Sequence, residues 1–145
     1  MTSRTVTATR IIAAPAEKIF DVLADPSQHP AIDGSGSLTK PRSNLGRLSL
    51  GAKFSMDMKL VVPYVTKNVV SEFEENRLIA WHHFAKFIWR YELEAVDGGT
   101  KVTETFDYSK PWGVILTPLG IPEKNRVGME KTLERLEHLV TTGAA

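Results

Sequence analysis

One carboxylate in this sequence has an unusual setting for a charged group. Glu104 alternates with Val102 and Phe106 in a stretch that predicts a β-strand, so the three side chains share one face. On a covered face, an unpaired carboxylate loses several kcal/mol of hydration. Glu104 is therefore a candidate general acid or base with a raised pKa, or an anchor for a ligand hydroxyl. The alternatives are a hydrated position near a cavity mouth, or an ion pair with an arginine such as Arg10.

Two adjacent histidines, His82 and His83, form the second candidate group. A strand sends neighbouring side chains to opposite faces. If residues 85–86 form a tight turn, His82 points inward and makes a proton-handling pair with Glu104. A longer loop or a bulge turns Trp81 and His83 inward instead. His82 is thus a candidate catalytic residue, and a hydrogen-bonded core or rim histidine is the alternative.

The sequence contains few of the residue patterns that bind metals or cofactors. The chain has no cysteine, and its four histidines lack the HExxH pattern or a comparable ligand spacing. The run Asp33-Gly-Ser-Gly36 lacks the lysine of a phosphate-binding loop, and no serine lies in a GxSxG turn. The sequence predicts no metal and no cofactor.

A larger group of residues is apolar, polarisable or aromatic and falls on predicted inner surfaces. Methionine and aromatic side chains fill adaptable sites, although each of these residues is equally well explained as plain core. The candidate ligand-binding residues are Phe54, Met56, Met58, Trp81, Trp89, Tyr91, Phe106, Ile115, Met129 and Leu133.

Composition limits the classes of partner. The chain has 145 residues and a formal net charge of +1, which is too small a charge to favour nucleic acid. No apolar run approaches the ~18 residues of a membrane span, and residues 1–10 lack the apolar stretch of a secretory signal. We expect a cytoplasmic monomer or homodimer with a small apolar ligand and no nucleic-acid partner.

The hydrophobic pattern predicts an α+β protein. One strand is followed by two short helices, then by an antiparallel meander and a long helix. The second short helix is capped by Asp25 and runs through Gln28, before Pro30 interrupts it. The predicted elements are strand Thr5–Ile12, the helix after Pro15, strands Leu38–Lys40, Leu45–Leu50, Lys53–Leu60, Tyr64–Glu74, Leu78–Phe84, Phe87–Asp97 and Thr100–Tyr108, and helix Pro122–Thr141.

The last hairpin allows its register to be counted. With residues 98–99 as a two-residue glycine loop, Asp97 pairs with Thr100. Counting outward places Leu93 opposite Glu104. One face of the hairpin is then aromatic and the other polar, as in an antiparallel sheet covered on one side.

Three segments carry a resemblance to a known family. They are Ile12–Pro26, Ser71–Trp81, and Trp89–Glu94 together with Gly98–Glu104. In order and spacing they resemble the START-like, or SRPBCC, superfamily, in its polyketide cyclase/dehydrase and lipid-transport branch; Glu75-Asn76 departs from it in one turn. The resemblance implies a helix-grip fold over residues 1–145 as a single domain. In that fold a curved antiparallel sheet wraps around the C-terminal helix, and two short helices follow the first strand.

The resemblance also implies an apolar small-molecule ligand between sheet and helix, and it leaves three classes of function open. The first is a carrier or binding protein for a lipid-like or aromatic, polyketide-like molecule. The second is a cyclase/dehydrase-type enzyme in which Glu104 or His82 moves protons. The third is a co-chaperone-like interaction module.

The connection from Trp112 to Pro122 is the most apolar stretch of the chain, yet it contains two glycines and two prolines. We expect Val114–Leu116 to form a short turn that dips into the pocket. Two interpretations remain: a lid that admits the ligand or makes transient membrane contact, and a plug that fills one end of the core.

Overall fold

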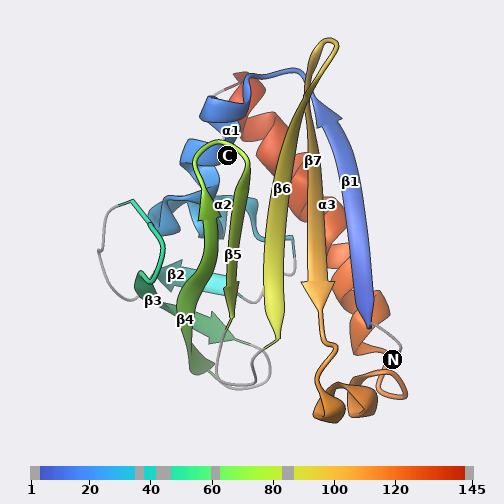
Figure 1. The fold of residues 1–145 in the computed structure, drawn as a ribbon. Coiled ribbons are helices and arrows are strands. Elements are labelled where there is room, and N and C mark those ends of the chain that lie inside the picture. Colours follow the sequence, from blue (N-terminus) through green and yellow to red (C-terminus); the bar gives the residue numbers. More distant parts are fainter. Residues whose placement is uncertain (1–3, 35–37, 42–46, 60–62, 83–86, 143–145) are drawn as a thin grey trace.

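The computed structural model describes residues 4–34, 38–41, 47–59, 63–82 and 87–142 (Figure 1). The long strands and the last helix begin and end within one residue of their predicted bounds wherever those residues are described. The elements are β1 (Thr5–Ile12), α1 (Ala16–Leu23), η1 (Pro26–Gln28), α2 (His29–Ile32), β2 (Leu38–Pro41), β3 (Lys53–Lys59), β4 (Pro63–Glu74), β5 (Leu78–His82), β6 (Ile88–Val96), β7 (Gly99–Asp107), η2 (Pro111–Leu116) and α3 (Ile121–Thr142).

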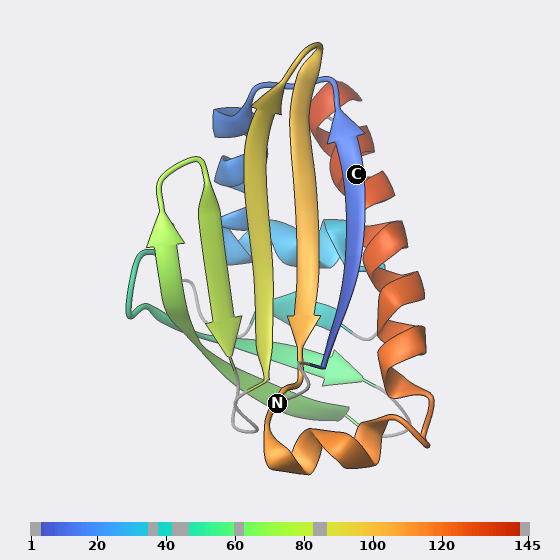
Figure 2. The same cartoon turned by 45° about the vertical axis from the view of Figure 1, so that its right-hand side comes forward.

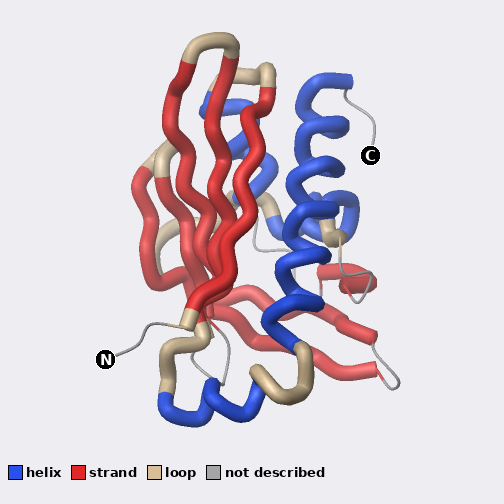
Figure 3. The backbone as a smooth tube through the Cα atoms, turned by 90° about the vertical axis from the view of Figure 1, so that its right-hand side faces the viewer, coloured by secondary structure: helices blue, strands red, loops and turns tan. Residues whose placement is uncertain are grey.

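Seven strands form one antiparallel sheet in the order β1-β7-β6-β5-β4-β3-β2. The sheet curves, and α3 runs along its covered face, as Figures 2 and 3 show from two sides. The short helices α1 and α2 lie on the same side of the sheet as α3. This arrangement confirms the predicted α+β helix-grip fold.

The core lies between the sheet and the helices. In the helix predicted over Pro122–Thr141, the apolar residues that recur at helical spacing are all buried: Met129, Leu133, Leu136 and Val140. The apolar positions of α1 that recur at helical spacing, Ile19, Phe20 and Leu23, are buried as well. Both stripes follow from burial of one helix face, which is why periodicity alone predicted them.

The register of the β6–β7 hairpin differs from the counted one by two residues. Val96 pairs with Gly99, so the loop residues are Asp97 and Gly98, and Tyr91 lies opposite Glu104. Gly98 has a φ of 83°, the left-handed conformation that favours glycine at the second loop position. The predicted pairing of Leu93 with Glu104 is therefore wrong. A shift of two residues keeps each side chain on its predicted face.

The β5–β6 hairpin also corrects an expectation. Trp81 pairs with Trp89, and His82 pairs with Ile88. The two tryptophans therefore share a face with Tyr91, and His82 lies on the opposite face from Glu104. The tight-turn alternative is thus wrong. Of the two, the looser connection that turns Trp81 inward is the one present, and His83 lies outside the described residues.

The segment between α1 and β2 contains two short helical turns. Asp25 accepts a hydrogen bond from the Ser27 amide at 3.0 Å, which confirms its predicted role as a cap. The helix after this cap is η1, and it ends at Gln28 as predicted. The chain does not leave helical geometry at Pro30, however, because Pro30 occupies the first turn of a separate helix, α2, where its missing N–H would have had no partner.

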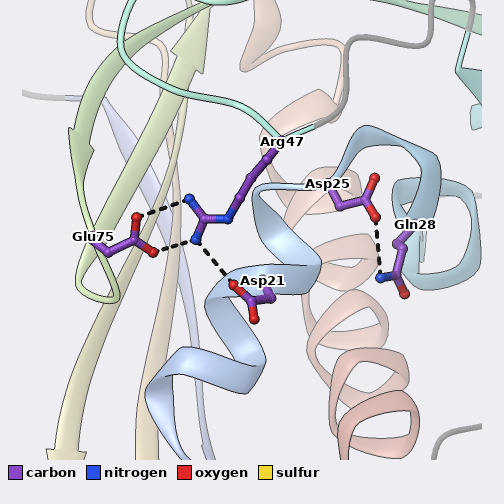
Figure 4. A network of polar contacts seen from close by, with 5 residues as sticks. All are labelled: Asp21, Asp25, Gln28, Arg47 and Glu75. Carbon is purple, nitrogen blue, oxygen red and sulfur yellow. Dashed lines mark hydrogen bonds and ion pairs between the residues drawn. The ribbon is translucent and has the colours of Figure 1, made fainter.

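Residues 47–50 do not form the predicted strand; residues 45–46 lie outside the described chain. This segment is held by contacts with other elements. The Leu48 amide donates a hydrogen bond to the Ala24 carbonyl at 2.7 Å. The guanidinium of Arg47 pairs with Asp21 of α1 and with Glu75 in the turn after β4 (Figure 4). Ion pairs with α1 and with that turn, rather than β-strand hydrogen bonds, therefore hold residue 47 in place.

Candidate functional site

Glu104 occupies the middle of β7, on the covered face of the sheet. Its neighbours on that face are Val102 and Phe106, and it lies opposite Tyr91 on β6 and Ala8 on β1. Only 2% of its surface is exposed. The hydrated position near a cavity mouth is therefore excluded for Glu104.

Arg10 does not form the ion pair with Glu104 that was offered as an alternative, because it pairs with Glu137 instead. Arg10 extends from β1 to Glu137 of α3, and its Nη2 lies 2.8 Å from Oε1 of Glu137. Glu104 instead receives one hydrogen bond, from the hydroxyl of Tyr91. Its Oε1 is fully buried, and it has no hydrogen-bond partner among the residues that the structure describes. An oxygen in this condition is rare in folded proteins and calls for a functional explanation.

Burial sets the protonation state of this carboxyl group. Loss of hydration raises the pKa of Glu104 from 4.5 to about 8, against the lowering effect of the Tyr91 hydrogen bond. The negative charge of Asp33 raises it further. Burial and the neighbouring Glu104 also raise the pKa of Tyr91. At neutral pH the pair is therefore uncharged, with Glu104 carrying a proton.

Aromatic rings extend from Tyr91 toward the short helices. The ring of Trp81 lies 5.7 Å from that of Tyr91 and 5.4 Å from that of Phe54, measured between centroids. His29 of α2 stacks on the other side of Trp81 at 5.2 Å. Three of the predicted ligand-binding residues thus form one cluster beside Glu104, with a histidine at its end.

His29 has two interpretations in the sequence: it lines the entrance together with Asp33, or it belongs to a capped short helix. It is buried, and Nε2 lies 2.8 Å from the Leu23 carbonyl, which can only accept, so Nε2 carries the hydrogen. Burial lowers the pKa of His29, opposed by this hydrogen bond and by the charges of Asp25 and Asp33. The available signal was its place just after the Asp25 cap, which fixes where a short helix begins.

A second aromatic group lies on the other side of Glu104. Trp89 and Phe106 have ring centroids 4.6 Å apart, and Phe106 stacks on Tyr108 at 5.4 Å. Phe106 also meets Phe87 edge to face at 5.9 Å. These rings extend from the buried carboxyl toward the end of β7, where η2 begins.

Helix α3 forms the opposite wall of this interior. Met129 and Leu133 are buried on it, and Phe54 and Met56 are buried on β3. The four predicted ligand-binding residues therefore come from the sheet and the helix that face each other across the core.

The loop after α2 is pressed against α3. The Gly34 amide donates to the hydroxyl of Thr132 at 2.8 Å, and that hydroxyl donates to the Gly128 carbonyl at 3.0 Å. A Cβ at Gly34 would lie 2.2 Å from the Gly128 oxygen, so only glycine fits. This contact places Asp33 where its charge acts on Glu104.

Two predicted site residues lie apart from this interior. His82 is on the opposite face of the sheet from Glu104, so the predicted Glu–His pair does not form. Ile115 is 60% exposed on η2, and Val114 is 51% exposed, so neither dips into the pocket nor plugs the core. Met58 lies on β3, and its side chain is outside the described part of the structure.

Chemically, the arrangement is a neutral acid in an apolar, aromatic interior. Protonated Glu104 can donate one hydrogen bond, and Oε1 can accept another. Among the residues that the structure describes, no three histidine, aspartate or glutamate side chains gather as metal ligands would. The interior is thus suited to an uncharged molecule with few polar atoms.

Comparison with known sequences identifies the class. Residues 3–141 match the family described as polyketide cyclase / dehydrase and lipid transport. The chain belongs to this family, as the resemblance in its three sequence segments predicted.

Individual relatives share the fold or part of the sequence. An uncharacterized Mycobacterium tuberculosis protein, Rv0088, is 37% identical over 142 residues; the match covers 92% of this chain and 63% of that protein. This chain thus spans less than two thirds of that relative.

Two solved structures show the same fold. An AHSA1-like protein from Aeromonas hydrophila has a TM-score of 0.73 at 16% identity, covering 97% of this chain and 94% of its own. A Polyketide_cyc-like protein, Cgl2372 from Corynebacterium glutamicum, has a TM-score of 0.63 at 20% identity, covering 98% and 94%.

Proposed function

We propose that this protein binds a small, uncharged, mainly apolar molecule between the sheet and α3, with Glu104 as the polar contact. The observation that carries the proposal is the buried Oε1 of Glu104, which has no hydrogen-bond partner within the described part of the chain. A ligand hydroxyl or amide N–H at this position would supply the missing hydrogen bond. The aromatic cluster and the methionines on both walls supply the apolar contacts.

The chemistry of the interior also limits the ligand. A carboxylate-bearing ligand would lose hydration in this interior and would place a negative charge near that of Asp33, and both effects disfavour its binding. Ring systems match the walls, because aromatic pairs add about 0.5–1.5 kcal/mol beyond the area they bury. We therefore propose a ring-containing ligand with one hydroxyl or carbonyl group.

A pair of probes tests the polar contact directly. 2-Naphthol and 2-methylnaphthalene have nearly the same shape, and only the first carries a hydroxyl. We expect wild type to prefer 2-naphthol by about five- to tenfold, the worth of one hydrogen bond, in calorimetric titrations. Glu104→Leu should abolish this preference while retaining 2-methylnaphthalene binding.

The control is Glu94→Gln, at an exposed position on the same hairpin. This variant should keep the preference for 2-naphthol. Equal affinities of the two probes for wild type would contradict the role of Glu104. Absence of binding for both probes would contradict an interior site for ring compounds.

A second function is favoured by one observation, the burial of Glu104, which raises the pKa of its carboxyl group. A carboxyl with a pKa of about 8 can give up and take back a proton near neutral pH, as a cyclase/dehydrase-type enzyme requires. With 2-tetralone in heavy water, ionised Glu104 would take a proton from the carbon beside the ketone and leave an enolate. The carboxyl group would then exchange that proton for a deuteron from the solvent and return the deuteron to the same carbon. Faster deuterium incorporation with wild type than with Glu104→Gln would support an enzymatic function. Equal rates for the two proteins would contradict it, and binding would then be the proposed function that remains.

A further inference from the structure

The connection between β7 and α3 presents an apolar surface to solvent. We name it the η2 patch and define it by four exposed side chains: Trp112 (48%), Val114 (51%), Ile115 (60%) and Leu119 (68%). In Figure 3 this segment projects at the end of the molecule where β7 ends and α3 begins. Exposed apolar side chains gathered in one short segment commonly mark an interaction site.

The η2 patch is held in place by its own sequence. Gly113 is buried against β7, and a Cβ there would lie 2.0 Å from the backbone oxygen of Tyr108. The Gly113 amide donates to the Lys110 carbonyl at 2.8 Å, and Leu116 packs against the core. Val114 and Ile115, between these two anchors, are therefore turned outward by a fixed turn.

Charge around the η2 patch indicates its partner. From Tyr108 to Pro122 the sequence contains one charged residue, Lys110, and no acid. Arg126 of α3 is paired with Glu123 and Glu130, so its charge is neutralised within the helix. The remaining cations nearest to the patch in sequence are Lys110 on one side and Lys124 on the other. Lysines thus flank the segment that carries the exposed apolar side chains.

We propose that the η2 patch docks onto an anionic lipid surface. Tryptophan and aliphatic side chains enter the interface between headgroups and acyl chains, and lysines beside them contact anionic headgroups. Within the described residues, no helix is long and apolar enough to cross a bilayer, so the contact is peripheral. A second copy of the chain fits less well, because four half-exposed side chains supply less than the ~800 Å² per partner of a stable interface.

Docking through the η2 patch would bring the interior close to the lipid surface. Tyr108, against which Gly113 packs, stacks on Phe106, the neighbour of Glu104 on the covered face. The inference stands apart from the proposed function, because lipid docking is measured without any interior ligand.

Vesicle co-flotation tests the proposal. Wild type should bind vesicles of phosphatidylcholine with phosphatidylglycerol more tightly than vesicles of phosphatidylcholine alone, and added salt should weaken the binding. Ile115→Glu should abolish binding, and Lys110→Gln should weaken it by about fivefold. Leu50→Glu is the matched control, because Leu50 is 66% exposed but lies outside the patch.

Three results would overturn the proposal. The first is equal vesicle binding by wild type and Ile115→Glu, and the second is no vesicle binding by wild type. The third is a wild-type dimer in sedimentation velocity that Ile115→Glu dissociates while vesicles bind neither protein, which would assign the patch to a second copy. Because all three altered side chains are exposed, circular dichroism should show every variant folded.

Discussion

At the residue scale, the account depends on the protonation of one carboxyl group. Glu104 is buried beside Tyr91, with Asp33 adding negative charge nearby. A protein can keep such a group at neutral pH because the proton removes the charge that would otherwise require hydration. What remains is the free-energy cost of burying Oε1 without a hydrogen-bond partner among the described residues. A ligand that donates a hydrogen bond to this oxygen would remove that cost.

The pH dependence of stability follows from this raised pKa. Below about 4.5 both folded and unfolded chains carry the Glu104 proton, and the stability from this group is fully present. Between about 4.5 and 8 only the folded chain keeps it, so the free energy of unfolding falls by about 1.4 kcal/mol per pH unit. Glu104→Gln has no proton to lose and should lack this decline.

Urea unfolding of both proteins over this pH range measures the difference. The gap between Glu104→Gln and wild type should change in favour of the variant as the pH rises. Glu94→Gln, at an exposed position, should follow wild type. Parallel profiles for wild type and Glu104→Gln would show that Glu104 is ionised or hydrated in the folded protein.

The hydroxyl of Tyr91 has its own expected effect. It donates to Glu104 and thereby holds the pKa of that carboxyl below the value that burial alone would give. Tyr91→Phe should raise the pKa of Glu104 further and lower the free energy of unfolding by about 1 kcal/mol. Carbon-13 NMR titration of the glutamate side-chain carboxyls measures the pKa. A lower pKa in the variant would contradict the hydrogen bond.

At the element scale, the two glycines of the last hairpin have different tasks. Gly98 takes the left-handed loop conformation, and nothing lies within 4 Å of a Cβ built there. A Cβ at Gly99 would lie 2.0 Å from the backbone oxygen of Ile12, because β1 crosses closely at this point. The first glycine serves the turn and the second serves strand packing.

Asparagine at each position separates these tasks. Gly98→Asn should cost less than about 1 kcal/mol, since asparagine tolerates the left-handed region and the space is open. Gly99→Asn should cost at least ~2 kcal/mol, because β1 must shift. Thermal or urea unfolding of the two variants compares them directly. Equal losses would mean that β1 does not approach Gly99 as described.

The same hairpin shows how far the sequence could predict the site. Period-two alternation placed Tyr91 and Glu104 on one face, and an error of two residues leaves faces unchanged. The register error did, however, pair Glu104 with Leu93, so the sequence did not predict that Tyr91 lies directly opposite Glu104. Which glycine forms the turn depends on contact with β1, a segment far away in sequence.

The orientations of Trp81 and His82 and the place of His29 could not be predicted from the sequence for a related reason. The loop after β5 decides whether Trp81 or His82 faces inward, and its length did not specify a turn. The stacking of His29 on Trp81 joins two segments about fifty residues apart, for which one sequence carries no local signal. Helix stripes and strand faces were predictable because burial alone determines them.

At the scale of the whole molecule, the two proposals concern two regions joined by one strand. The interior around Glu104 lies on the covered face of β7, and the η2 patch follows the end of that strand. The aromatic side chains of Phe106 and Tyr108 lie between them. A protein that takes an apolar molecule from a lipid surface would require this order of parts.

The central claim, an uncharged ring compound between the sheet and α3, is tested most directly by NMR with carbon-13 methionine methyl groups. Met56 lies on β3 and Met129 on α3, both buried on facing walls. With 2-naphthol bound, we predict intermolecular nuclear Overhauser effects to both methyl groups, reduced in Glu104→Leu at the same probe concentration. Effects to neither methyl group, with the probe contacting exposed residues instead, would contradict the account.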